Sequence, residues 1–221
     1  MSDLAPYIDH TLLKPEATRE QIESLCAEAA EHKFSTVCVN GSRVELAYSL
    51  LEESDVQVAA VVGFPLGAAE ADSKRYETEV AIDQGAGEID MVMNVGRFKD
   101  GDHDYIVREI RDVVEAADDH VVKVILETCL LTDAQIEQAC KLVVQAQAHF
   151  VKTSTGFGSA GTTIEHVELM RETVGQFAGV KAAGGIRDAA TARAMIEAGA
   201  TRLGTSNGIA IVTGEGTGEG Y

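Results

Sequence analysis

Short apolar segments rich in β-branched residues alternate along the whole chain with segments whose apolar residues recur at helical spacing. The first pattern is typical of β-strands and the second of amphipathic helices. In the helical segment 18–32, the apolar residues at this spacing are Ile22, Leu25, Cys26 and Ala29. The expected strands are residues 7–10, 35–40, 56–64, 88–94, 121–127, 149–155, 179–185 and 201–206. The pattern therefore predicts eight successive strand–helix units.

Helix starts are marked by a threonine or serine that is followed three residues later by glutamine or glutamate, the spacing of a capping box. The pairs are Thr18/Gln21, Ser42/Glu45, Thr132/Gln135 and Thr162/Glu165. Each pair lies a few residues after a predicted strand or loop. We therefore expect each of them to begin a helix.

The number of units decides between two α/β architectures. Eight units in 221 residues leave roughly 28 residues per unit, a compact count for a (β/α)8 barrel. A doubly wound sheet also alternates strands and helices, but it usually has a glycine-rich first turn. The first turn here, IDHTLLKPE, contains no glycine. We therefore predict a single-domain (β/α)8 TIM barrel over residues 1–213 and a flexible glycine-rich tail over residues 214–221.

The charge of the chain excludes some partners. It has 36 acidic residues against 18 Lys and Arg, which gives a formal net charge of −18. Such a charge repels nucleic acid and anionic membranes, so we expect neither as a partner. The acids are spread over predicted helices, which suggests a solvated surface adapted to high salt. With no apolar segment long enough to span a bilayer and no secretory signal, a cytoplasmic protein is expected.

The cysteines and histidines do not predict a metal site. Cys26, Cys38, Cys129 and Cys140 form no Cys-x-x-Cys motif, and none has a nearby histidine at zinc-ligand spacing. We therefore expect free, mostly buried thiols in a reducing compartment.

Three of the eight lysines, Lys123, Lys152 and Lys181, lie inside the most strand-like segments. Lysine is rarely buried, although a single lysine can lie along apolar surface with its ammonium group in water. Two ammonium groups in one cavity lower each other's pKa, as does burial. A lysine that is neutral near pH 7 can attack a carbonyl group. Lys152 and Lys181 are therefore candidates for carbonyl chemistry.

Further polar residues fall at the ends of the predicted strands, where barrels build their active sites. Side-chain alternation places Asp90 on one face of its strand, and it places Lys123 and Glu127 on one face of the next. The first predicted strand ends with Asp9 and His10. Asp90 can keep a second lysine charged and pass protons through water. A buried ion pair that only balances charge is the alternative.

Two late loops are candidates for phosphate binding. AAGGIR follows the seventh predicted strand and LGTSNG the eighth, and both offer glycines and backbone N–H groups. Barrels often bind phosphate at this position with the start of a short extra helix. The segment NGIAIV is the expected helix.

The motifs IDHTLLKP, TVCVN, VVGFPLG, EIDMVMN, VKVILE, FVKTSTGFG, VKAAGGIR and RLGTS follow one another over nearly the whole chain. In this order they resemble the deoxyribose-phosphate aldolase family, class I (Schiff-base) aldolases with a (β/α)8 fold. FVKTSTGF and KAAGGIR together are the most specific part of the match. The resemblance implies reversible cleavage of 2-deoxy-D-ribose 5-phosphate to D-glyceraldehyde 3-phosphate and acetaldehyde. It implies no metal and no organic cofactor.

The resemblance also assigns roles to residues of this chain. It implies a Schiff-base lysine at Lys152, a proton-relay pair at Asp90 and Lys181, and further active-site groups at Lys123 and Asp9. The implied substrate and phosphate contacts are Thr155, Gly184, Gly185, Gly204 and Ser206.

Two positions depart from the family pattern or extend it. Asn207 stands where many relatives have a second serine, which weakens phosphate binding if that hydroxyl is a contact. Tyr221 ends the tail, and we hypothesise a minor catalytic role for its phenol.

Other functions stay open at this point. A transaldolase-like or keto-acid aldolase barrel shares the lysine but prefers ketose or keto-acid substrates. A non-catalytic phosphate-binding barrel binds the sugar phosphate without a covalent adduct. The expected partners are thus a small sugar phosphate and aldehydes, and the acidic helix faces leave room for a homo-oligomer, a dimer or a tetramer.

Overall fold

Eight parallel strands close into a barrel in the computed structural model, which describes residues 3–214. The strands pair in sequence order, and β8 pairs back with β1. They are β1 (Ile8–Leu12), β2 (Thr36–Asn40), β3 (Gln57–Val62), β4 (Glu88–Val92), β5 (Val121–Ile125), β6 (Phe150–Lys152), β7 (Gly179–Ala183) and β8 (Arg202–Thr205). The predicted (β/α)8 barrel is therefore confirmed. Of the predicted tail, only Gly214 falls within the described residues.

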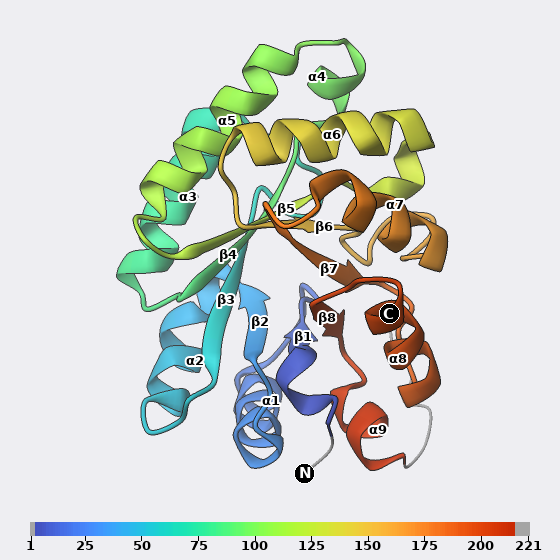
Figure 1. Ribbon diagram of the computed structural model, residues 1–221. Helices are drawn as coiled ribbons and strands as arrows, with labels where there is room; N and C mark the ends of the chain where they lie inside the picture. Colours follow the sequence, from blue (N-terminus) through green and yellow to red (C-terminus); the bar gives the residue numbers. More distant parts are fainter. Residues whose placement is uncertain (1–2, 215–221) are drawn as a thin grey trace.

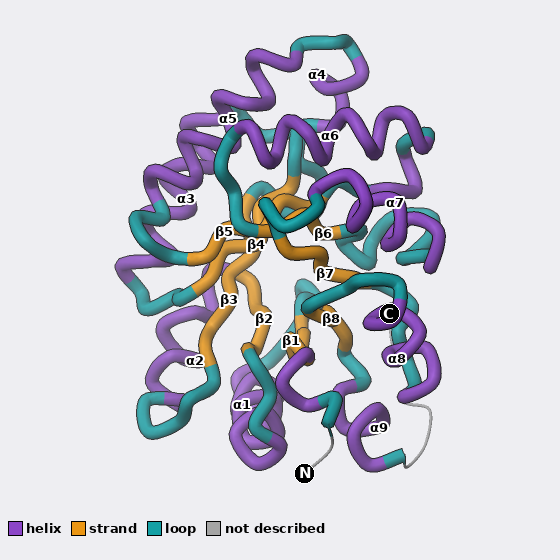
Figure 2. The backbone as a smooth tube through the Cα atoms, in the orientation of Figure 1, coloured by secondary structure: helices purple, strands orange, loops and turns teal. Residues whose placement is uncertain are grey.

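Helices surround the strands, as Figures 1 and 2 show. The α-helices are α1 (Arg19–His32), α2 (Val44–Leu51), α3 (Ala71–Asp83), α4 (Val95–Lys99), α5 (His103–Ala116), α6 (Asp133–Gln145), α7 (Ile164–Val174), α8 (Ala189–Glu197) and α9 (Gly208–Thr213). Single 3-10 turns occur at Ala5–Tyr7, Gly41–Arg43 and Thr128–Leu130. The short helix expected after the eighth strand is α9. No helix among residues 3–214 is long and apolar enough to cross a membrane.

The predicted capping boxes have mixed outcomes. Those at Thr18 and Thr132 are confirmed, since each side chain accepts a hydrogen bond from the backbone N–H three residues later. The cap predicted at Thr162 is displaced by one residue, because Thr163 caps α7 in its place. The prediction at Ser42 is wrong. Ser42 lies inside a 3-10 turn, and α2 starts without any side-chain cap.

Strand β6 is shorter than the predicted segment 149–155, and the Thr153 hydroxyl takes the place of a backbone partner where it ends. The Thr153 hydroxyl donates to the carbonyl oxygen of Ala183 at 3.1 Å and accepts from the Ala183 N–H at 3.0 Å. These bonds end the regular ladder just after Lys152. The chain that follows is free to form the loop that carries Ser154 and Thr155.

The hydrophobic core has two parts of unequal size. The large part fills the layer between the strands and the surrounding helices. The small part lies inside the barrel and contains Leu13, Cys38, Ala59 and Val61, with Phe64 packed against it. The small apolar cluster comes from the β1 to β3 side. The remaining wall of the barrel interior is therefore available for polar side chains.

A buried ion pair joins α3 to α5. Lys74 and Glu109 have fully buried side chains, and their charged atoms lie 2.7 Å apart. The Lys74 ammonium group also donates to the carbonyl oxygens of Gly67 and Val92, both at 2.8 Å. The second Glu109 oxygen accepts from the Asn94 N–H at 3.1 Å. The pair thus fixes the chain after β3 and after β4 to the outer helices.

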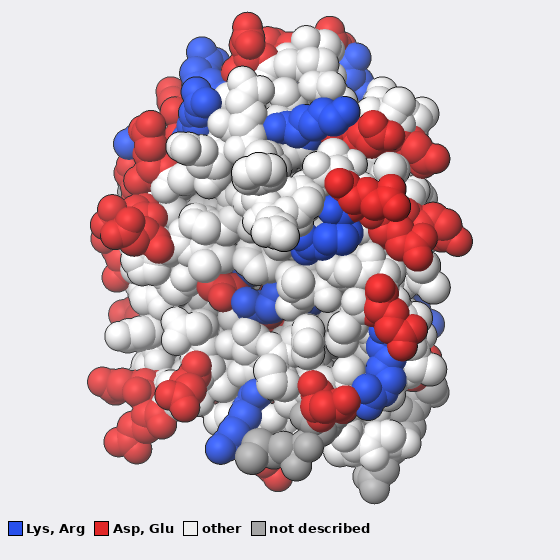
Figure 3. Space-filling model, viewed as in Figure 1, with Lys and Arg blue, Asp and Glu red and all other residues white. Residues whose placement is uncertain are grey.

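Acidic side chains stand out on the face of the molecule drawn in Figure 3. On the face shown in Figure 3, Asp and Glu stand mainly around the periphery, and the centre is mostly uncharged. Their positions agree with the predicted spread of acids over the helices.

Candidate active site

Strand register brings the three interior lysines and Asp90 together inside the barrel. Asp90 of β4 pairs with Lys123 of β5, and Lys152 of β6 pairs with Lys181 of β7. Lys152 also pairs with Ile125 of β5, two residues after Lys123. Because alternate residues of a strand share a face, Lys123 and Lys152 both point into the barrel.

Asp90 is the centre of this cluster. One of its carboxylate oxygens lies 2.6 Å from Lys123 Nζ, and the other lies 2.6 Å from Lys152 Nζ and 2.7 Å from Lys181 Nζ. Burial alone raises the pKa of Asp90, but the three ammonium groups outweigh burial and hold that pKa well below its ordinary value. Asp90 is therefore an ionised acceptor that contacts all three lysines.

A second layer of charges lies next to Asp90. Asp9 is 2.5 Å from Lys181 Nζ and 3.8 Å from Lys123 Nζ. Arg202 forms hydrogen bonds with both Asp9 and Glu88, and Glu88 lies 2.5 Å from Lys123 Nζ. Against burial, Lys181, Lys123 and Arg202 lower the pKa of Asp9 to about 2. The sequence patterns identified Asp9 but not Glu88 and Arg202.

The same sequence signal that marked the lysines, a charged residue within a strand-like segment, also marks Glu88 and Arg202. Each is a charged residue inside a segment that otherwise has strand character, at Glu88 in EIDMVMN and Arg202 in TRLGTS. A pattern defined by lysines within strands leaves the other charged residue types unmarked.

The environment divides the three lysines into two kinds. Burial lowers the pKa of Lys152 and Lys181 adds to that effect, while Asp90 opposes it; the net result is a pKa below the ordinary lysine value. Burial also acts on Lys181, but Asp9 and Asp90 outweigh it and raise the Lys181 pKa. The Lys123 pKa is likewise raised, chiefly by Asp90 acting against burial. We expected the neighbouring ammonium groups and burial to lower the lysine pKa values. Among the three lysines, that lowering outweighs the effect of the carboxylates at Lys152 alone.

A small pocket opens above this cluster at the ends of the strands. Lys152 lines it, together with the predicted contact residues Thr155, Gly184, Gly185, Gly204 and Ser206. Asp90, Lys181, Lys123 and Asp9 do not line it and lie fully buried below. Lys152 is thus the member of the cluster that reaches the pocket.

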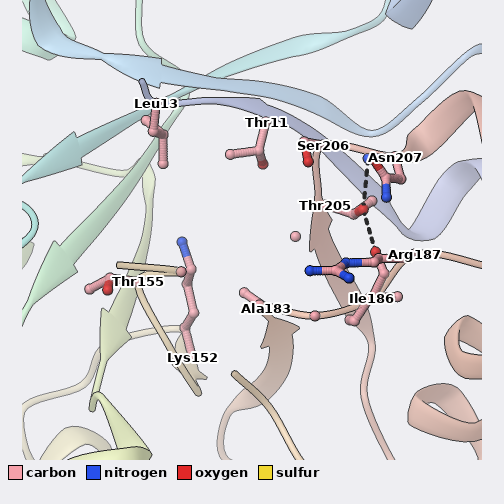
Figure 4. Close-up of a pocket in the computed structure, with 14 residues that line it drawn as sticks. Thr11, Leu13, Lys152, Thr155, Ala183, Ile186, Arg187, Thr205, Ser206 and Asn207 are labelled. Atoms are coloured by element: carbon pink, nitrogen blue, oxygen red, sulfur yellow. Dashed lines mark hydrogen bonds between the residues drawn. The ribbon is translucent and has the colours of Figure 1, made fainter. Parts of the chain in front are cut away.

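Figure 4 shows how the pocket is arranged. Lys152 and Arg187 point into the same space from different sides, and Ser206 and Asn207 come from the loop after β8. Arg187 was quoted in the motif AAGGIR but not singled out, because an arginine in an exposed loop has no pattern that marks it. It places a positive charge at the rim of the pocket.

The loops after β6, β7 and β8 are joined by short contacts. The Thr162 N–H donates to the Gly184 carbonyl oxygen at 3.1 Å, and a Cβ atom on Gly161 would lie 2.3 Å from that oxygen. Thr205 donates to the Ile186 carbonyl oxygen at 2.7 Å and accepts from the Asn207 N–H at 2.9 Å (Figure 4). The Asn207 backbone N–H is therefore already engaged within the loop.

Glu127 organises the loop that carries Thr155. Its carboxylate accepts a short hydrogen bond from the Thr155 hydroxyl and another, at 3.3 Å, from the Thr155 N–H. The same hydroxyl accepts from the Phe157 N–H at 3.0 Å. Glu127 itself has a left-handed backbone with φ 54°, which is uncommon for a residue with a side chain. Its strand position was noted in the sequence, but its contact with Thr155 was not.

The fold is a closed (β/α)8 barrel, and a polar pocket at the ends of its strands lies over buried lysines and carboxylates. This arrangement is typical of a barrel enzyme. Comparison with known proteins then gives the family. The model of the DeoC/LacD family aldolases matches residues 4–214. The chain belongs to this family, and the resemblance predicted from its motifs is confirmed.

Individual relatives agree with the family match. The chain is 57% identical over 216 residues to the deoxyribose-phosphate aldolase of Brevibacillus brevis, which covers 97% of this chain and 98% of the relative. A solved structure described as the aldolase QR15 has a TM-score of 0.93 at 42% identity, with 96% and 95% of the two chains covered. The deoxyribose phosphate aldolase of Aeropyrum pernix, described as a unique tetrameric structure, has a TM-score of 0.89 at 33% identity, with 95% and 89% covered.

Proposed function

We propose that the protein catalyses the reversible aldol cleavage of 2-deoxy-D-ribose 5-phosphate to D-glyceraldehyde 3-phosphate and acetaldehyde through a Schiff base at Lys152. One observation carries the choice of lysine. Of the three lysines in the barrel interior, Lys152 alone lines the pocket and alone has a lowered pKa. The substrate is inferred from the similarity to relatives named deoxyribose-phosphate aldolase.

The reaction begins with attack of neutral Lys152 Nζ on the C1 aldehyde of the open-chain sugar. Loss of water from the adduct gives a protonated imine. Asp90, assisted by Lys181 and a water molecule, removes the proton of the C3 hydroxyl as the C2–C3 bond breaks. The electron pair of that bond flows into the imine, which gives an enamine and releases D-glyceraldehyde 3-phosphate. Protonation of the enamine at C2 and hydrolysis of the imine release acetaldehyde and restore Lys152.

The remaining residues support these steps. Lys123 and Asp9 balance charge around Asp90 and Lys181, so that the lysine in the pocket is the one with the lowered pKa. We assign the phosphate to the loops after β7 and β8, with Gly184, Gly185 and Ser206 as contacts. In a protein with a net charge of −18, a phosphate dianion needs a local cation, and Arg187 supplies it.

Borohydride trapping with 2-deoxyribose 5-phosphate tests the proposal. We expect one adduct by intact mass, mapped to the peptide that contains Lys152. Lys152→Ala should abolish the adduct and the activity, whereas Lys141→Ala, which removes an exposed lysine on α6, should change neither. Asp90→Asn should lower turnover far more than it weakens substrate binding.

The outcomes separate the alternative functions. Binding of the sugar phosphate without an adduct would favour the non-catalytic barrel. An adduct with ketose or keto-acid substrates in preference to the deoxy sugar would favour another Schiff-base enzyme. An active Lys152→Ala variant, or an adduct on Lys181 or Lys123, would refute the assignment of Lys152.

Several properties stay predictions from the sequence. They are a cytoplasmic location, independence of metals and organic cofactors, and a homo-oligomeric state, for which the tetrameric description of the Aeropyrum pernix relative is support. Light scattering on the purified protein measures the oligomer. Tyr221 lies outside the described residues, and unchanged turnover after deletion of residues 214–221 would rule out its predicted role.

A further inference from the structure

We propose that Glu88 and Arg202 are positioning residues that set the protonation state of Lys152 from the opposite end of the barrel, by fixing the charge balance of its interior. The inference rests on the proposed function, in which neutral Lys152 is the nucleophile. Glu88 is the first residue of β4 and Arg202 the first of β8, whereas the pocket lies at the other ends of the strands. Neither residue lines the pocket.

The charges of the cluster balance when Lys152 is neutral. Its carboxylates are Asp9, Glu88 and Asp90, and its cations other than Lys152 are Lys123, Lys181 and Arg202. Three negative charges therefore face three positive charges. A proton on Lys152 adds one uncompensated charge to a buried site, which is unfavourable. Without Glu88 and Arg202, the two remaining carboxylates face the two remaining lysines, so the charges still balance. Removing both members of the pair therefore leaves the net charge of the cluster unchanged, whereas removing one of them changes it.

Continuous contacts link the pair to Lys152 by two routes. On one route, Glu88 lies 2.5 Å from Lys123 Nζ, which lies 2.6 Å from Asp90, the partner of Lys152. On the other, Arg202 Nε donates to Asp9 at 2.7 Å, and Asp9 lies 2.5 Å from Lys181 Nζ. Lys181 in turn lies 2.7 Å from Asp90.

Glu88 and Arg202 also form a bidentate pair with each other. The two contacts measure 3.0 Å and 3.1 Å. Only 9% of the Glu88 side chain and 12% of the Arg202 side chain are exposed. Low exposure keeps water from screening either charge, so removal of one leaves the other acting on the cluster.

Lys152 is the lysine of this cluster whose pKa is lowered, so its protonation is the one that the surrounding charges decide. The groups that act on Lys152 from the neighbouring strands are Asp90 on β4, which it contacts, Lys181 on β7 and Cys38 on β2. Asp9 on β1 and Lys123 on β5 lie one contact further away, against Lys181 and Asp90. Glu127, beyond the end of β5, is hydrogen-bonded to Thr155. The carboxyl pKa values of Asp9 and Asp90 are lowered, and the pKa values of Lys123 and Lys181 are raised. Burial raises the pKa of the Cys38 thiol, so it stays protonated.

The two single variants Glu88→Gln and Arg202→Gln are predicted to shift the pH profile in opposite directions. The acidic limb of log(kcat/KM) reports the free enzyme's essential base, which is Lys152 here. Glu88→Gln removes a negative charge, lowers the Lys152 pKa and moves the limb to lower pH. Arg202→Gln removes a positive charge and moves the limb to higher pH. A unit charge about 10 Å away, at an effective dielectric constant of about 20, shifts a pKa by roughly one unit, so we expect limbs displaced by that order.

The double variant and a conservative variant are the controls. Glu88→Gln combined with Arg202→Gln should return the limb to its original position, and Arg202→Lys, which keeps the charge, should leave the limb in place. The same order should appear in the pH dependence of Lys152 trapping by acetaldehyde and cyanoborohydride, read by peptide mapping. This second measurement does not depend on turnover.

The results separate this inference from a purely structural role. If both single variants lose activity with unmoved limbs, or shift in the same direction, the pair only holds the fold and the inference is wrong. If Arg202→Gln does not fold, the direction of the Glu88→Gln shift decides. Absence of any Lys152 adduct in the unmodified protein would instead refute the proposed function.

Discussion

Replacing Lys74 with methionine removes the ammonium group that faces the buried carboxylate of Glu109. Breaking a buried ion pair by removing one partner typically costs about 3–5 kcal/mol, because a buried charge is left uncompensated. Here the carbonyl oxygens of Gly67 and Val92 lose a donor as well, at about 1 kcal/mol each. We therefore expect Lys74→Met to be among the most destabilising single changes outside the active site.

Protonation of Glu109 limits this cost and makes it depend on pH. Burial raises the Glu109 pKa even in the intact protein, where Lys74 opposes the effect. Without Lys74 the pKa rises further, and a carboxyl with a raised folded-state pKa destabilises the fold above its unfolded pKa of about 4.3. That cost is lost as pH falls through the raised pKa. At about 1.4 kcal/mol per pH unit, its upper limit is about 5 kcal/mol at pH 8 and about 1.6 kcal/mol at pH 5.5.

Urea unfolding at pH 8 and pH 5.5 measures the effect. Arg75→Met is a matched control, because Arg75 is the next residue of α3 and forms half-exposed ion pairs with Glu79 and Glu115. Its loss should cost less than about 1 kcal/mol at both pH values. Two outcomes would contradict the role assigned to Lys74 opposite Glu109. One is a Lys74→Met variant that is no less stable than Arg75→Met at pH 8, and the other is a loss of stability that does not change with pH.

Two further predictions concern helix starts and thiols. Thr132→Ala should lower the free energy of unfolding by about 1 kcal/mol, whereas Ser42→Ala should change it by less than about 0.5 kcal/mol, because Thr132 caps a helix and Ser42 does not. Equal losses in the free energy of unfolding for the two variants would contradict the assignment of Thr132, and not Ser42, as a helix cap. Among the free thiols, half-buried Cys129 should react first with a disulfide reagent at pH 8, since burial raises the pKa of the other three. Mapping of the labelled peptides checks the order, and rapid labelling of a buried thiol would contradict it.

The barrel was predictable because strand and helix periodicities alternate without interruption and the unit count suits closure. The inward orientation of Asp90, Lys123, Lys152 and Lys181 follows from the same periodicity, since alternation decides which face of a strand each side chain takes. Local capping signals were less decisive. Thr162 and Thr163 both offer a hydroxyl with a residue three positions later that can complete the turn, and only the packed helix start selects Thr163.

Contacts between distant segments were beyond the reach of pattern reasoning. Lys74 and Glu109 lie on amphipathic helices, where a charged residue is ordinarily solvated, and their burial follows from the packing of α3 against α5. Arg187 reaches the pocket because the chain after β7 turns it there. No local sequence pattern marks Lys74, Glu109 or Arg187, because their surroundings depend on which surfaces pack together after folding.

The acidic surface drawn in Figure 3 has a consequence for substrate capture. A phosphate dianion that approaches a body with a net charge of −18 moves against the long-range field, and the cationic group at the pocket rim acts only at short distance. Dissolved salt weakens the repulsion before it weakens the contact, because screening grows with separation. The encounter rate with the dianion should therefore increase with ionic strength, and the mutual repulsion among the outer helices should fall over the same range.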